Sequence, residues 1–131
     1  MTNAPVDLVD AATAVRENAV APFSGFKVGS ALRTDKGTIY AGCNVENATL
    51  GLTVCAERVA LWKALSEGEQ AFTEIAVVTA AQRPTPPCGA CRQLLWEFCG
   101  DIPVFMVSTL GKSATLLLSE LVPYAFDKRD L

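Results

Sequence analysis

The stretch IAVVTAAQRPTPPCGACRQLLWEFCGDIPVFMVS, residues 75–108, predicts a strand, a helix and a second strand in that order. The apolar run Ile75–Ala80 is typical of a buried strand, and no regular element can continue through the proline-rich segment Arg83–Pro87. Gly89–Phe98 has apolar residues at helical spacing, and Val104–Ser108 is again an apolar strand. The proline-rich break therefore places two cysteines at the start of a buried helix.

Outside this stretch the chain predicts more elements of both kinds. They are a helix at Asp7–Asn18, a hairpin of Phe26–Arg33 and Thr38–Asn44, a helix at Cys55–Glu67, a strand at Ala114–Leu118 and a helical turn at Ser119–Val122. An initial hairpin followed by alternating helices and strands predicts an α/β fold, with a five-stranded mixed sheet covered by helices on both faces. We expect one domain over residues 1–131.

Composition excludes several classes of protein. Half of the 131 residues are apolar and 19% are charged, which argues against disorder. The net charge of −3 lacks the basic excess of a nucleic-acid binder. Charged residues interrupt every apolar run well before the roughly 18 residues that a membrane helix needs. Met1–Asp10 has no secretory pattern, so we expect a cytoplasmic protein without nucleic-acid or membrane partners.

The chain has five cysteines and no histidine. A transition metal would therefore be held mainly by sulfur, and no imidazole is available as an acid or base. Cys88 and Cys91 face the same way at a helix start, where the positive end of the helix dipole favours thiolates. A single C-x-x-C is also found in thioredoxin-like redox sites, so this pair alone leaves metal binding and redox chemistry open.

A third thiol favours a metal site. Cys55 also opens a predicted helix, and three thiolates with an open fourth position are typical of catalytic zinc. Arg58 is placed to offset the excess negative charge by hydrogen bonding to sulfur. Cys43 and Cys99 need no role beyond that of small buried apolar residues.

Glu57 is the candidate proton carrier, because it lies two residues from a ligand in a chain without histidine. The alternative is a solvated glutamate on a helix surface. Residues i and i+2 of a regular helix point to different sides, so Glu57 reaches the metal only if the ion lies near the helix end.

Together these residues resemble a known family. The segments Cys55-Ala56-Glu57-Arg58 and Pro87-Cys88-Gly89-Ala90-Cys91-Arg92-Gln93 are similar to the motifs of small homotetrameric zinc-dependent cytidine deaminases. The similarity extends to Phe26–Gly29, Gly42–Asn47 and Pro123–Phe126. It implies the three-layer α/β/α cytidine deaminase-like fold, one Zn²⁺ per subunit and a homotetramer with shared active sites.

The resemblance also implies residue roles. Cys55, Cys88 and Cys91 would ligate zinc, and Glu57 would carry protons during hydrolysis of cytidine or 2′-deoxycytidine to the uridine nucleoside and ammonia, a reaction of pyrimidine salvage. Nucleoside-binding roles fall to Asn44 and Glu46 at the ribose 3′-hydroxyl, to Phe26 and Ala56, and to Phe126 stacking from a neighbouring subunit. Phe26 and Phe126 are alternatively core aromatics, and Asn44 with Glu46 a solvated loop edge. Leu50 departs from the family, where many members have an aromatic residue.

Other functions are tested by the same residues. A structural zinc site or a dithiol switch has no need of a carboxylate two residues from a ligand. A polynucleotide-editing deaminase is disfavoured by the acidic balance and the lack of a basic stripe. A deaminase of modified cytosine nucleosides or of a nucleoside antibiotic remains an alternative within the class.

Overall fold

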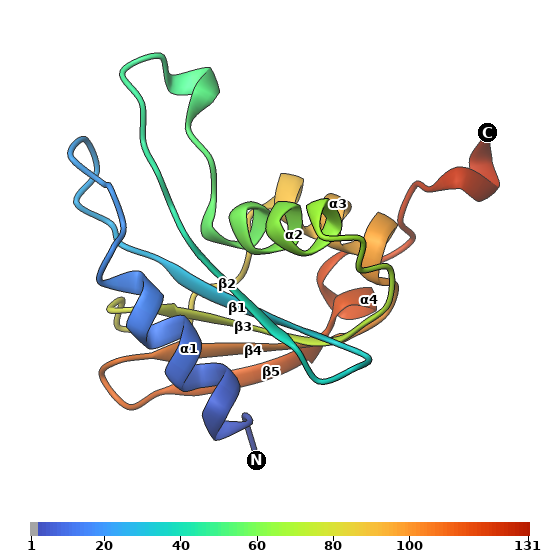
Figure 1. Cartoon of the computed structure of the whole chain (residues 1–131), viewed down its shortest axis with the longest axis horizontal. Coiled ribbons are helices and arrows are strands. Elements are labelled where there is room, and N and C mark those ends of the chain that lie inside the picture. The colour runs from blue at the N-terminus through green and yellow to red at the C-terminus, as the bar shows by residue number, and fades with distance from the viewer. Residues whose placement is uncertain (1–2) are drawn as a thin grey trace.

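The computed structural model describes residues 3–131 and contains one sheet with helices on both sides (Figure 1). The helices are α1 (Val6–Arg16), α2 (Ala56–Ser66), α3 (Gly89–Cys99) and α4 (Leu118–Leu121), with 3-10 turns η1 (Leu50–Leu52) and η2 (Lys128–Asp130). The strands are β1 (Gly29–Thr34), β2 (Ile39–Cys43), β3 (Phe72–Thr79), β4 (Pro103–Ser108) and β5 (Ser113–Leu117).

The sheet is mixed, as the sequence predicts. Its order is β2-β1-β3-β4-β5; β3 and β4 run parallel, and the other neighbours run antiparallel. The parallel pair needs a crossover, and α3 supplies it. This crossover brings the start of α3 to the end of the sheet at which β3 finishes.

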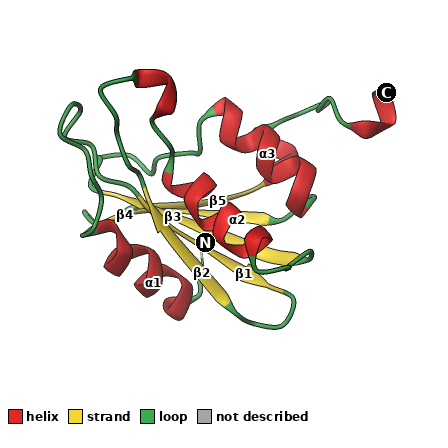
Figure 2. Ribbon diagram, turned by 45° about the horizontal axis from the view of Figure 1, so that its top comes forward, coloured by secondary structure: helices red, strands yellow, loops and turns green. Residues whose placement is uncertain are grey.

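Alternation along β3 builds the two cores. Ile75 and Val77 pack with α2, α3 and α4, whereas Ala76 and Val78 pack with Leu8 of α1 on the opposite face. Successive strand residues point to opposite faces, so a continuous apolar run buries both. The fold is therefore the three-layer α/β/α arrangement, with α1 on one face and α2 with α3 on the other (Figure 2). No described helix has the length and apolar character needed to cross a membrane.

The start of β1 differs from the sequence prediction. The predicted strand begins at Phe26, but regular pairing begins at Gly29, opposite Cys43. Between these positions the side chain of Asn44 replaces a neighbouring strand: its Oδ1 accepts from the Val28 amide at 2.9 Å and its Nδ2 donates to the Phe26 carbonyl at 2.7 Å. Apart from one backbone bond, from the Asn44 amide to the Val28 carbonyl at 3.3 Å, residues 26–28 are bonded by this side chain rather than by a backbone ladder, which leaves them outside the strand.

Candidate active site

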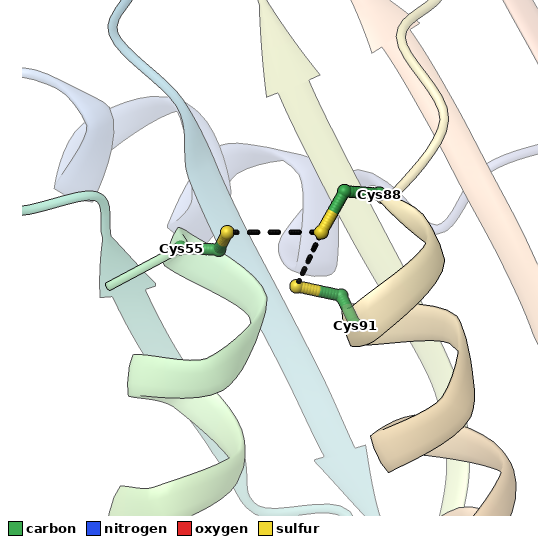
Figure 3. Close-up of side chains that lie close together, drawn as sticks. All are labelled: Cys55, Cys88 and Cys91. Atoms are coloured by element: carbon green, nitrogen blue, oxygen red, sulfur yellow. Dashed lines mark hydrogen bonds between the residues drawn. The ribbon is translucent and has the colours of Figure 1, made fainter. Parts of the chain in front are cut away.

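Three sulfur atoms meet where α2 and α3 begin. Cys55 and Cys88 are the N-cap residues of these helices, and Cys91 lies in the first turn of α3. Sγ of Cys88 is 3.9 Å from Sγ of Cys55 and 3.4 Å from Sγ of Cys91 (Figure 3). All three sulfurs lie within 4.8 Å of one another.

The donor set fits zinc. Tetrahedral Zn–S bonds of about 2.3 Å place sulfurs roughly 3.8 Å apart, close to the spacing found here. Three sulfurs supply three of the four ligands of a tetrahedral zinc site, so the fourth position would fall to a non-protein ligand. Among the described residues this is the one group of three or more cysteine or acidic side chains with such spacing.

The surroundings favour the thiolate form of Cys55, whereas the interaction with Cys55 and burial raise the pKa of the Cys91 thiol. Interaction with the Cys91 sulfur lowers the pKa of the Cys55 thiol to about 6, and Cys88 and the positive charge of Arg58 act in the same direction. The Cys91 sulfur in turn raises the pKa of Arg58. Arg58 thus lies beside the cluster, and its buried Nε has no hydrogen-bond partner among the described residues.

Glu57 is buried, with 5% of its surface exposed. Burial raises the pKa of its carboxyl to about 7, and the nearby Cys55 adds to this rise. The i, i+2 objection does not apply, because Cys55 has extended backbone angles (φ −75°, ψ 153°) and precedes the first helical turn. Cys55 and Glu57 consequently border the same cavity.

This cavity has a volume of about 230 Å³. Its wall is mostly apolar and is formed by Phe26, Val28, Asn44, Thr53, Val54, Cys55, Ala56, Glu57, Val77, Thr85, Pro86 and Cys88. Most sites for drug-sized ligands measure roughly 300–1,000 Å³, so this one takes a small ligand or one that extends beyond it. The predicted residues Phe26, Asn44 and Ala56 therefore lie together with Glu57 and two of the thiols.

Glu46 lies beside this cavity rather than in its wall. It borders an adjoining hollow with Phe23, Ser24, Leu50 and Thr53. Its Oε1 accepts hydrogen bonds from the amides of Phe23 (2.9 Å) and Ser24 (3.0 Å), and Oε2 accepts from the Ser24 hydroxyl. A bridge between Val20 and Val45 joins the two projecting loops that carry these residues, and a bridge between Val45 and Val54 pairs the two arms of the second loop (Figure 1).

Phe126 is separate from the cavity of its own chain. It lines a different hollow with Tyr124, Ala125, Arg129 and Asp130, and 60% of its surface is exposed. The alternative of a core aromatic is wrong for Phe126. Phe26, at 41% exposure, is not a core residue either.

Thr85 is a site residue that the sequence did not reveal. It lies in the cavity wall, and its hydroxyl is 2.9 Å from that of the buried Thr79 at the end of β3. The one available signal was its position in the proline-rich break just before Cys88.

Comparison with known proteins now identifies the family. The family model of the cytidine and deoxycytidylate deaminase zinc-binding region matches residues 3–107. This chain belongs to that family. The family model describes a zinc-binding region, and the cluster of Cys55, Cys88 and Cys91 is consistent with one zinc site in this chain.

Relatives in the family cover nearly the whole chain. The cytidine deaminase of Sporosarcina psychrophila is 47% identical over 117 residues, 88% of this chain and 86% of the relative. That of Halalkalibacterium halodurans is 46% identical over 125 residues, 95% of each chain. A crystal structure of cytidine deaminase from Burkholderia pseudomallei superposes with a TM-score of 0.89 at 45% identity, covering 96% of this chain and 100% of that one. The zinc interpretation of the C-x-x-C pair is thereby confirmed over the redox one.

Proposed function

We propose that the protein is a zinc-dependent cytidine deaminase, which hydrolyses cytidine and 2′-deoxycytidine to uridine and 2′-deoxyuridine with release of ammonia in pyrimidine salvage. The observation that carries this proposal is the buried Glu57 carboxyl in one cavity wall with Cys55 and Cys88. A buried carboxyl beside a metal cluster can move protons without competition from bulk water.

The roles of the cluster residues follow from chemistry. Cys55, Cys88 and Cys91 hold the zinc, which when bound supplies Lewis-acid activation of water at neutral pH. Glu57 accepts a proton from the attacking water and delivers it to the pyrimidine ring nitrogen, then takes the remaining proton of the hydroxyl added at C4 and transfers it to the departing amine as the C4 carbonyl forms. One water is consumed, one ammonia leaves, and Glu57 returns to its starting state. Arg58 offsets part of the negative charge of the thiolates.

The nucleoside is held by the rest of the cavity wall and by Glu46 beside it. Phe26 packs against it, Ala56 contacts it beside the cluster, and Asn44 with Glu46 hydrogen-bonds the ribose 3′-hydroxyl. The Asn44 amide can do this while still bonding Phe26 and Val28, because it keeps one N–H and one acceptor lone pair. Glu46 likewise retains acceptor capacity on Oε2.

We further infer a homotetramer in which Phe126 of one subunit closes the cavity of another. The exposure of Phe126 outside its own chain's cavity supports this, as does a cavity too small to enclose a large ligand by itself. A single domain is supported by one sheet against which α1, α2 and α3 all pack. A cytoplasmic location without nucleic-acid partners is supported by five free cysteines and the net charge of −3.

The test is an ultraviolet assay of cytidine loss, with zinc measured on the same sample and a panel of modified cytosine nucleosides assayed in parallel. Cytidine and deoxycytidine should be the best substrates, with about one zinc per chain. A sample fully loaded with zinc that leaves both nucleosides unchanged would contradict the proposal. A clear preference for a modified nucleoside would reassign the substrate within the class.

Shared sites have their own test. Glu57→Gln and Phe126→Ala chains are each expected to be impaired, yet mixed oligomers should regain activity, because some sites combine an intact Glu57 with an intact Phe126. Mixed oligomers that stay at the mean of the two variants would place Phe126 at its own chain's site or outside any site.

A further inference from the structure

Two side chains of α3 hold the C-terminal segment in place. Gln93 Nε2 donates to the Phe126 carbonyl at 2.8 Å, and Trp96 Nε1 donates to Oδ2 of Asp127 at 2.9 Å. Gln93 and Trp96 are three residues apart, so they lie on the same helix face. The Phe126 carbonyl and the residue that follows it are therefore both fixed to α3.

Asp127 joins this attachment to the end of the chain. Its two oxygens accept from the backbone amide, Nε and Nη2 of Arg129 at 2.7–2.9 Å, as well as from Trp96. It also caps η2, and its side chain is only 11% exposed. A network of four hydrogen bonds to one carboxylate makes the segment after Phe126 a defined structure rather than a loose tail.

The attached segment presents an aromatic side chain that is 60% exposed and outside its own chain's cavity. Fixing an exposed side chain in advance lowers the entropy lost when another surface binds it. The attachment to α3 would therefore strengthen binding if Phe126 contacts the surface of a partner.

We propose that Gln93 and Trp96 are positioning residues, which hold Phe126 in the orientation required to close the active site of a neighbouring subunit. This inference rests on the shared active site proposed above. One helix then serves two sites: the start of α3 carries Cys88 and Cys91 for its own chain, and its middle holds the aromatic lid of another. Trp96 is about 12 Å along the axis from Cys88, at 1.5 Å per residue.

Trp96→Phe tests the proposal, because it keeps an aromatic ring and removes the indole N–H. The loss of a hydrogen bond to a carboxylate is expected to raise KM for cytidine about tenfold, with kcat changed by less than about twofold. The variant should retain one zinc per chain, since the ligands at the start of α3 are untouched. Trp62→Phe is the matched control; its ring packs edge-on against Phe98, 6.3 Å away, and its KM should stay at the wild-type value.

A double variant separates positioning from general stability. If Trp96 acts through Phe126, then Trp96→Phe should add nothing to the defect of Phe126→Ala. An additive defect, or a loss of zinc in Trp96→Phe, would overturn the proposal. Gln93→Leu removes the donor to the Phe126 carbonyl. If Trp96→Phe does not fold, Gln93→Leu can be combined with Phe126→Ala in the same double-variant comparison.

Mixing experiments show in which subunit's active site the KM changes. Trp96→Phe chains mixed with Glu57→Gln chains should recover wild-type KM at sites that combine an intact Glu57 with a lid from the Glu57→Gln chain. Suppose that mixtures of Glu57→Gln with Phe126→Ala chains regain activity, whereas mixtures of Glu57→Gln with Trp96→Phe chains do not regain wild-type KM. This result would overturn the present inference and leave the shared site intact. Recovery with neither would refute the shared site itself, and this inference with it.

Discussion

Gly42→Ala should move α2 and thereby disturb the metal cluster. Gly42 lies in β2 directly under the first turns of α2. A Cβ at this position would lie 2.5 Å from the Ala60 amide nitrogen and 2.8 Å from the Ala56 carbonyl oxygen. Both atoms belong to helix backbone, which cannot rotate away as a flexible side chain can. The helix itself must shift.

The size of the shift follows from these distances. An ordinary contact begins near 3.4 Å, so α2 must retreat by roughly 0.9 Å. Cys55 and Glu57 move with α2, whereas Cys88 and Cys91 stay with α3. A misplacement of about 1 Å can reduce turnover about 10²-fold, and overpacking of this kind costs about 1–3 kcal/mol of stability. We expect kcat to fall 10- to 100-fold and zinc to bind more weakly.

The measurements are kcat by the ultraviolet assay, zinc content after dialysis, and thermal unfolding. Gly29→Ala is the matched control, because its Cβ would meet the Ala12 carbonyl of α1 on the opposite face at 1.9 Å. It should lose stability while its folded fraction keeps kcat and zinc. Wild-type kcat and zinc binding in Gly42→Ala would refute this reasoning. An equal loss of kcat in Gly29→Ala would attribute the effect to general destabilisation.

Three further changes have distinct expected results. Glu57→Gln should retain the fold and the zinc while turnover falls by about 10² to 10⁴, the usual contribution of a positioned acid/base; a near wild-type rate would require another proton carrier. Cys88→Ser should remove zinc and activity together, since the chain has no histidine to replace a ligand, and full zinc occupancy would exclude Cys88 from the set. Asp7→Asn should lower Tm at neutral pH, because hydrogen bonding to Arg33 lowers the pKa of Asp7. That contribution is present above the ordinary pKa of 3.8 and is lost as pH falls through the lower folded value, so wild type and variant should converge in Tm in strong acid. A constant difference in Tm down to that range would contradict this origin.

The succession of elements could be predicted because each apolar run has a clear period. The run in β3 buries both of its faces, and the proline-rich break before Cys88 allows only one place for α3 to begin. The beginning of β1 could not be predicted, because it depends on a side-chain contact between Asn44 and residues 26–28. Contacts of this kind leave no periodic signal in the sequence.

The candidate site was partly predictable for a similar reason. Thiol chemistry and the absence of histidine single out Cys55, Cys88 and Cys91 from residue type and position alone. That Glu57 shares a cavity with Cys55 depends on the extended N-cap geometry, which spacing does not reveal. The wall position of Thr85 and the attachment through Trp96 depend on the packing of distant segments.

If active sites are shared as proposed, the placement of exposed apolar side chains also constrains how the subunits combine. Phe23, Phe26 and Leu50 are exposed around the two adjoining hollows, whereas Phe126 is exposed on a segment attached to α3. When Phe126 of one subunit contacts the cavity edge of the next, the two contacting surfaces are different. Repeating such a contact from subunit to subunit would give an open chain of subunits unless symmetry closes it. A twofold axis closes it, because each subunit then gives its lid to the other and receives one in return. The number of complete sites then equals the number of chains, and the tetramer is the case in which two such pairs associate.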